Sequence, residues 1–228
     1  MAEDVERRLE LKTKAADSDI TEIRAWVRTH PAGFVQAYPP RQVNSIYFDT
    51  PVLTSFAENL SGQSARRKLR LRWYGTDDRK AVCVVEAKCK RGGLGWKLTR
   101  SLPSVVDLTR IRWVDLTALI RRIVETDLDL YLGDALTPVI LNRYRREYFV
   151  TMDGRVRITL DADQRLHDQR FVRGPNLHVE EPPSAEAVVE FKASKDDGDR
   201  LAGISSTFPI RLEKSSKYVD GVHRLLTL

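Results

Sequence analysis

The sequence is poor in the features that anchor a protein in a membrane or cross-link it through disulfide bonds. No apolar run approaches the roughly 20 residues that a transmembrane helix needs, and the N-terminal residues lack the basic and then apolar order of a signal peptide. The two cysteines, Cys83 and Cys89, fall in one expected strand, about 20 Å apart, which is beyond disulfide reach. We therefore expect a cytoplasmic protein with free thiols.

Motifs for common cofactors are also missing. The two cysteines and four histidines show no zinc-ligand spacing, and all four histidines, including His167, are expected at the surface. The glycine-rich segment at 91–95 lacks the spacing of a Walker phosphate loop and is more typical of a hairpin turn. Repeats and low-complexity segments are absent too, so the 228 residues predict a single domain over residues 1–228.

What the sequence does have is charge, with a basic excess. Lysine and arginine number 38 against 32 acidic residues, which gives a net charge of +6. A basic balance favours anionic partners such as nucleic acid, an acidic membrane surface or phosphate compounds, and it does not choose among them.

Charged and apolar residues alternate in five segments, as they do in strands with one apolar face. The segment 68–74 places Lys68, Arg70 and Arg72 on one side and apolar residues on the other. Similar alternation occurs at 8–12, 84–90, 157–161 and 189–192. One such strand is typical of a sheet with a wet face. Glu and Lys are depleted in strands, so five repetitions favour a different arrangement.

The arrangement that we predict is an α+β fold in which about eight antiparallel strands form a closed β-barrel tunnel. The charged strand faces would line its lumen, and short amphipathic helices would cover the apolar faces outside. Helical spacing predicts such helices after Asp19, from Thr50, at 115–126 and at 215–226.

A lumen with many lysines and arginines requires an anion between them. Phosphate suits arginine, because the planar guanidinium donates two hydrogen bonds at once. The carboxylates Glu10, Glu86 and Glu190 repel phosphate and therefore need another role. The usual role is to hold a divalent cation, Mg²⁺ or Mn²⁺, together with phosphate oxygens.

The ordered series of charged motifs resembles the VTC domain of the triphosphate tunnel metalloenzymes. The sharpest matches are SIYFDTP at 45–51 and KLRLRWYG at 68–75. Weaker motifs continue the match in order: Arg8-x-Glu10-x-Lys12, Glu86-x-Lys88-x-Lys90, Arg157-x-Thr159-x-Asp161, Glu190-x-Lys192 and Lys214-Ser215-Ser216-Lys217-Tyr218. The resemblance covers nearly the whole chain. Thr13 departs from it, since an aromatic residue often follows the first-strand lysine in the family.

The resemblance implies a polyphosphate polymerase. Such an enzyme transfers the terminal phosphoryl group of a nucleoside triphosphate, with ATP the first choice, to a growing inorganic polyphosphate chain. The catalytic phosphate contacts would come from Lys12, Arg70, Arg72, Lys88, Arg146 and Lys217. The further substrate-binding residues would be Arg8, Lys68, Lys90, Lys97, Arg100, Arg157, Lys192, Lys214 and Ser216. The metal would be held mainly by Glu190, with Glu10 and Glu86 as helpers.

Several alternatives stay open from the sequence. Both parities carry arginine between 143 and 146, and the family pattern favours Arg146 over Arg143. The same tunnel could hydrolyse triphosphate or polyphosphate with Glu10 or Glu86 as the base, or it could bind polyphosphate without turnover. No aromatic platform for stacking bases is apparent, which argues against nucleic acid as a partner, although Trp96 could touch a nucleotide base. The oligomeric state is not predicted.

Overall fold

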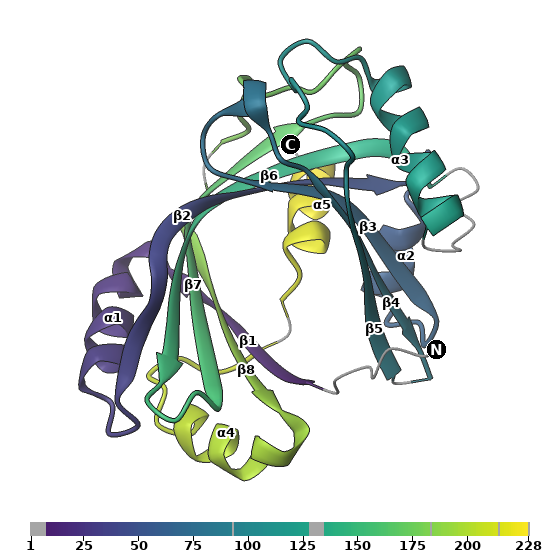
Figure 1. Ribbon diagram of the computed structural model, residues 1–228. Coiled ribbons are helices and arrows are strands. Elements are labelled where there is room, and N and C mark those ends of the chain that lie inside the picture. The colour runs from purple at the N-terminus through teal and green to yellow at the C-terminus, as the bar shows by residue number, and fades with distance from the viewer. Residues whose placement is uncertain (1–7, 93, 128–134, 183, 214, 228) are drawn as a thin grey trace. The chain divides into compact units, whose positions relative to one another are not determined.

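The structure is a computed structural model that describes residues 8–92, 94–127, 135–182, 184–213 and 215–227. These residues form one eight-stranded sheet and five α-helices (Figure 1). The strands are β1 (Arg8–Ala16), β2 (Phe34–Asp49), β3 (Arg66–Tyr74), β4 (Val84–Arg91), β5 (Leu94–Ser101), β6 (Thr137–Thr151), β7 (Val156–Asp168) and β8 (Glu186–Ser194). The helices are α1 (Ile20–Thr29), α2 (Thr54–Leu60), α3 (Trp113–Asp127), α4 (Gly198–Ser205) and α5 (Lys217–Thr227), with short 3₁₀ turns η1 (Asp17–Asp19), η2 (Asp78–Lys80) and η3 (Lys195–Asp197).

The strands follow the order β1-β8-β7-β6-β2-β3-β4-β5, and the pairs β1–β8, β2–β3, β3–β4, β4–β5 and β7–β8 are antiparallel. The prediction of an α+β fold with about eight strands is confirmed. The prediction of a closed barrel is wrong, because β1 and β5 are the two edges of the sheet in the described residues. Closure requires hydrogen bonds between the first and last strands. Side-chain alternation shows which residues share a face of a strand, but it does not show which strands pair with each other.

The chain divides into two compact units, and the long strands β2, β6 and β7 contribute residues to both. The first unit comprises residues 1–42, 144–164 and 184–215, and its described part includes β1, α1, β8 and α4. The second unit comprises residues 43–143, 165–183 and 216–228, and its described part includes α2, β3, β4, β5, α3 and α5. Each unit has an apolar core and a charged sheet face.

The core of the first unit combines one face of β1, β7 and β8 with the helices α1 and α4. Ile23 and Val27 of α1 are buried in the same cluster as Leu201 and Ile204 of α4 and Phe191 of β8. The spacing of four residues from Ile23 to Val27 keeps both on one stripe of the helix. Alternate strand residues point into this core, so the residues between them form the charged face.

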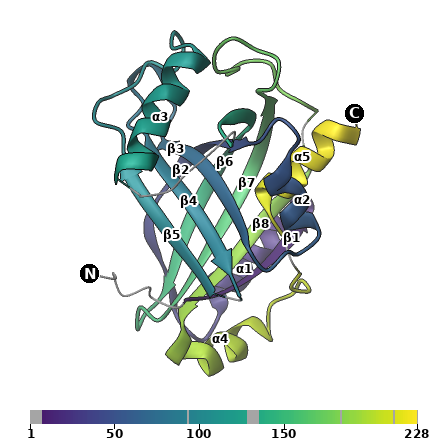
Figure 2. The ribbon, with the colours of Figure 1, turned by 90° about the vertical axis from the view of Figure 1, so that its right-hand side faces the viewer.

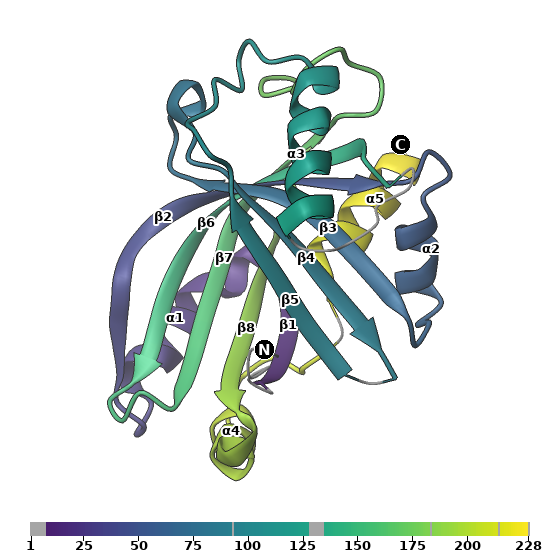
Figure 3. The same cartoon turned by 45° about the vertical axis from the view of Figure 1, so that its right-hand side comes forward.

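The core of the second unit combines α3 with the apolar face of β3 and β4. Leu116 and Ile120 of α3 share a buried cluster with Leu71 of β3, and Figure 3 shows α3 beside the upper ends of β3, β4 and β5. Cys83 and Cys89 are buried in the same cluster as free thiols. The expectation of unpaired cysteines is therefore confirmed.

The start of α2 differs from the sequence-based prediction. The helix begins at Thr54 rather than at Pro51. The Asp49 carboxylate accepts hydrogen bonds from the backbone amides of Ser55 and Phe56, at 2.8 and 2.9 Å. A carboxylate at this position satisfies amides that have no partner within the helix. The cap is thus supplied by Asp49, the last residue of β2, together with Thr50, whose Oγ1 accepts a hydrogen bond from the Thr54 amide at 3.0 Å.

One histidine also differs from expectation. His167 lies in β7 and is fully buried, with its Nδ1 3.1 Å from the carbonyl oxygen of Val179. Burial lowers the pKa of this imidazole. The expectation of a surface position is wrong because β7 continues to Asp168, well past the predicted segment. Within the described ranges, no helix combines the length and the apolar character that crossing a membrane requires.

Candidate functional site

The charged face of the second unit carries a row of lysines across three strands. The antiparallel register places Lys68 of β3 opposite Lys88 of β4, and Lys88 opposite Lys97 of β5. Residues that are directly opposite each other share one face of the sheet, and like charges in such positions repel. This lysine row therefore sets three positive charges side by side.

The neighbouring row is built around one buried carboxylate, Glu86, which lies opposite both Arg70 and Thr99. Arg70 Nε donates to Glu86 Oε2 at 2.6 Å, and Arg72 Nη1 lies 3.5 Å from the same oxygen. Lys97 Nζ lies 3.3 Å from Glu86 Oε1. Burial alone would raise the pKa of Glu86, but the three cations outweigh burial and lower this pKa to about 2. Glu86 therefore stays ionised and holds the two arginines beside each other.

Tyr47 of β2 extends this cluster toward α5. Its hydroxyl accepts a hydrogen bond from Arg70 at 3.3 Å, and its ring stacks on that of Tyr218, with 5.2 Å between the ring centres. Burial raises the pKa of Tyr47, but the nearby charges of Arg70, Arg72 and Lys217 outweigh burial and leave the pKa below its ordinary value. The side chains around Tyr47 thus create a strongly positive environment.

The beginning of α5 approaches the lysine row. Lys68 Nζ donates to Ser216 Oγ at 2.9 Å, one residue before α5. The helix is fixed by Val222 and Leu225, which share a buried cluster with Ile140, and it lies beside α2 (Figure 2). We name as the arginine–lysine cluster the predicted residues that the second unit brings together: Lys68, Arg70, Arg72, Glu86, Lys88, Lys97, Ser216 and Lys217.

Two β5 residues that were predicted to contact the substrate lie on the face of the sheet opposite to the lysine row. They are Arg100 and Trp96. Arg100 is opposite Val85, which is buried in the apolar core, so Arg100 and Lys97 point to opposite sides of β5. An odd and an even position of one strand cannot both face the same side. Trp96 packs against the apolar core as well, which removes it from the face that carries the lysine row.

On the charged face of the first unit, two carboxylates and two lysines lie close together. Lys12 lies opposite Glu190, and Glu10 lies opposite Lys192. Lys12 Nζ is 3.0 Å from Glu10 Oε1 and 3.1 Å from Glu190 Oε1. Lys192 Nζ is 2.7 Å from Glu190 Oε2. We call these four side chains the carboxylate–lysine cluster. Thr159 lies opposite Glu190 on β7, and in the described part of the chain its buried hydroxyl has no hydrogen-bond partner.

Arg146 forms a buried ion pair in the first unit. Its Nε and Nη2 donate to the two carboxylate oxygens of Asp161, at 2.5 and 2.6 Å. Burial opposes its charge, but the neighbouring Tyr144 and Asp161 outweigh burial and raise the pKa of Arg146. Arg143, the alternative that the sequence left open, belongs to the second unit and pairs with Asp78 at 2.9 Å.

Of the remaining predicted residues, two have described side chains, Lys90 and Arg157. Lys90 is opposite Arg66 on the face that carries Lys88, and Arg157 is exposed and opposite Lys192. Lys214 and the side chain of Arg8 lie outside the described residues. Sequence reasoning missed Tyr47 and Thr159 as members of these sites, although both stand inside motifs that it had singled out.

The carboxylate–lysine cluster offers a donor set that suits Mg²⁺ or Mn²⁺. Glu10 and Glu190 provide carboxylate oxygens, and the unpartnered hydroxyl of Thr159 lies beside Glu190. No group of three or more His, Cys, Asp or Glu side chains among the described residues could hold a metal by itself. Magnesium is often bound by one or two carboxylates plus substrate phosphates, so two carboxylates are sufficient. Glu86 fits less well because three cations already neutralise it.

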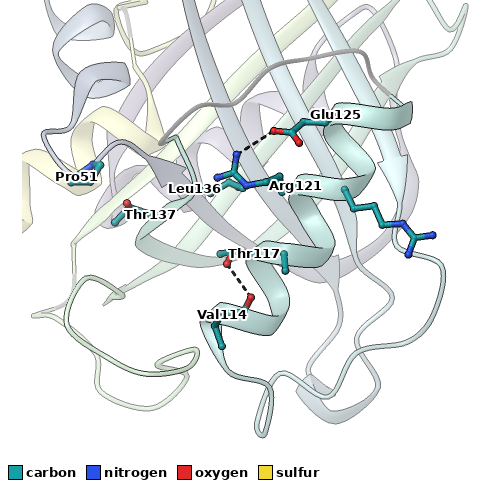
Figure 4. A pocket seen from close by; sticks show the side chains of 9 residues that line it. Pro51, Val114, Thr117, Arg121, Glu125, Leu136 and Thr137 are labelled. Carbon is teal, nitrogen blue, oxygen red and sulfur yellow. Dashed lines mark hydrogen bonds and ion pairs between the residues drawn. The ribbon is translucent and has the colours of Figure 1, made fainter.

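A separate open pocket of about 630 Å³ lies along α3 (Figure 4). Thr117, Arg121 and Glu125 line it from α3, and Pro51 and Leu136 line it from other segments. Arg121 points toward Glu125, with which it forms an ion pair at 3.2 Å. Within the described residues, the lining includes none of the side chains predicted to bind phosphate or metal, so the pocket is distinct from both clusters.

A family model described as the VTC domain matches residues 6–226, and no curated protein matches significantly. The chain is similar to the X-ray structure of a putative adenylate cyclase from Vibrio parahaemolyticus, with a TM-score of 0.48, 14% identity, and coverage of 97% of this chain and 98% of that chain. It is also similar to a chain in the Schizosaccharomyces pombe Mediator head module, with a TM-score of 0.47, 8% identity, and coverage of 96% and 94%.

Proposed function

Because the chain belongs to the VTC domain family, we propose that it is a metal-dependent polyphosphate polymerase. It would transfer the terminal phosphoryl group of a nucleoside triphosphate to a growing polyphosphate chain. The observation that carries this proposal is the lysine row of Lys68, Lys88 and Lys97 beside Arg70 and Arg72. Side-by-side like charges in a sheet cost free energy, and a polyanion lying along them offsets that cost.

The paired arginines are positioned for phosphate before it binds. Glu86 holds Arg70 and Arg72 through its Oε2 atom, so less side-chain freedom is lost on binding. A guanidinium donates two hydrogen bonds to one phosphate, whereas the lysines of the same face supply charge without fixed geometry. Together they would grip successive phosphates of a chain.

Glu190 and Glu10 are the proposed ligands of the divalent ion. Lys12 and Lys192 neutralise these carboxylates in the structure. An ion bound there would supply charge neutralisation for the phosphates during transfer. The two lysines would then turn to phosphate oxygens, since an ammonium group on a flexible stem reorients readily.

The protonation state of Glu86 supports transfer to phosphate over hydrolysis. Hydrolysis gains from a general base whose pKa lies near the operating pH. With its pKa lowered to about 2, Glu86 is a weak base, and Glu10 and Glu190 are both ion-paired with Lys12. A terminal phosphate is already an anion and attacks without such a base.

The test is to incubate the purified protein with ATP and Mn²⁺, to separate the products on a gel stained for polyphosphate, and to assay free phosphate in parallel. We expect long chains that disappear with chelator, in Arg72→Ala and in Glu190→Gln. Glu186→Gln is the matched control, because Glu186 lies on the same strand and its side chain is half exposed, at 49%. Phosphate release without chains would instead identify a hydrolase. Binding of tripolyphosphate without any product would identify a non-catalytic module.

A further inference from the structure

Tyrosine and arginine side chains alternate along part of β2 and β6 in the first unit. Arg146 Cζ lies 5.3 Å from the ring centre of Tyr144 and 5.8 Å from that of Tyr148. Arg41 Cζ lies 5.0 Å from the ring centre of Tyr148 and 5.9 Å from that of Tyr38. The series therefore runs from the buried Arg146 to Tyr38, which is 59% exposed.

The exposed end of this series is held by local contacts. Arg41 Nε donates to the hydroxyl oxygen of Tyr148 at 3.0 Å. The rings of Tyr38 and Tyr148 meet edge to face, with 5.6 Å between their centres. Pro39 and Pro40 follow Tyr38 and restrict the backbone there. We call Tyr38, Arg41 and Tyr148 the aromatic platform. A fixed platform binds a flat ligand with little loss of conformational entropy.

We propose that the aromatic platform is the subsite for the base of the nucleoside triphosphate donor. Bases stack on aromatic rings and on guanidinium groups with little preference among bases. The inference rests on the proposed function, to which it adds recognition of the part of the donor that carries no phosphate. Donor and product share their phosphates, but only the donor has a base. The platform would therefore distinguish ATP from polyphosphate.

The test compares ATP with tripolyphosphate, which has the same phosphates and no base. Dissociation constants are measured by titration calorimetry on the full chain. Loss of a stacking ring costs roughly tenfold in affinity, so Tyr38→Ala is expected to weaken ATP binding about tenfold and to leave tripolyphosphate binding unchanged. Tyr38→Phe keeps the ring and is expected to bind ATP like the wild type. Phe171→Ala removes another exposed ring, 87% exposed in a loop of the second unit, and is the control.

Two results would overturn the base subsite alone. One is a Tyr38→Ala protein that binds ATP as tightly as the wild type, and the other is an equal loss of affinity for ATP and tripolyphosphate. A wild-type protein that binds neither compound would overturn the proposed function together with the subsite. Because tripolyphosphate reports on the phosphate-binding residues by themselves, the two failures are distinguishable.

Discussion

The Tyr218 hydroxyl donates a hydrogen bond to the carboxylate of Asp49, and the same carboxylate caps the first turn of α2. Burial raises the pKa of Tyr218, and the hydrogen bond to Asp49 raises it further, so the hydroxyl remains a donor. One buried carboxylate thus joins the end of β2 to α2 and α5. Lys217, the residue before Tyr218, depends on this junction for its position.

Removal of the Tyr218 hydroxyl is expected to destabilise the protein. In Tyr218→Phe, the buried Asp49 carboxylate loses one donor, and a buried group left short of a hydrogen bond costs about 1–3 kcal/mol. The free energy of unfolding in urea measures the loss. Tyr38→Phe, which removes an exposed hydroxyl, is expected to change it little. Equal stability of both variants and the wild type would show that the bond contributes nothing.

Stability at acidic pH is expected to depend on Glu86. Its pKa is lowered from 4.5 to about 2 in the folded chain. The stabilisation from its ion pairs is therefore fully present above pH 4.5 and is lost as the pH falls toward 2. The difference in unfolding free energy between the wild type and Glu86→Gln should shrink along this range in urea titrations. A difference that stays constant with pH would contradict the ion-pair assignment, and Glu125→Gln in a surface pair serves as the control.

Phosphate binding is expected to follow the face of the sheet rather than the overall charge. Arg72→Ala removes a guanidinium group, with its paired hydrogen-bond donors, from the arginine–lysine cluster. It should weaken tripolyphosphate binding by about tenfold or more. Arg100→Ala removes the same charge from the opposite face of β5 and should leave the dissociation constant nearly unchanged. Arg72→Lys keeps the charge without the paired donors of the guanidinium, and its dissociation constant should lie between those of the two alanine variants. Equal effects of the two alanine variants would indicate nonspecific attraction.

The metal requirement is expected to rise when Glu10 is neutralised. Glu10→Gln leaves Glu190 as the one carboxylate of its cluster, so more Mn²⁺ is needed for half-maximal activity. The shift should be no smaller than the roughly 10-fold that loss of an outer-shell partner can cost. Manganese titrations of polyphosphate synthesis measure it, with Glu186→Gln as the control. An unchanged half-saturation point would remove Glu10 from the metal site.

Alternation along single strands was sufficient to predict the charged faces. It placed Arg70 and Arg72 together and separated them from Leu71, because the side-chain period of a strand is fixed at two. It also shows, in retrospect, that Lys97 and Arg100 could not share a face. Alternation could not predict whether the barrel closes, because closure depends on which strands pair at the edges of the sheet.

The aromatic platform was missed for a similar reason. Tyr38 and Tyr148 stand on different strands and far apart in the sequence, and neither belongs to a motif. Their contact depends on the pairing of β2 with β6, which no local pattern reports. The cap at Asp49 was missed because Pro51 suggested an earlier helix start, whereas Leu53 takes a positive φ of 57° and delays it to Thr54.

The cations of β3 repeat at every second residue, roughly 6.6 Å apart along the strand, through Lys68, Arg70 and Arg72. Polyphosphate is a series of identical anions, so a shift of the chain along such a face exchanges each contact for an equivalent one. No single register of the polymer would then be strongly preferred. Under the proposed function, a product that shifts by one phosphate after each addition would vacate the place of its own end, which suits processive elongation.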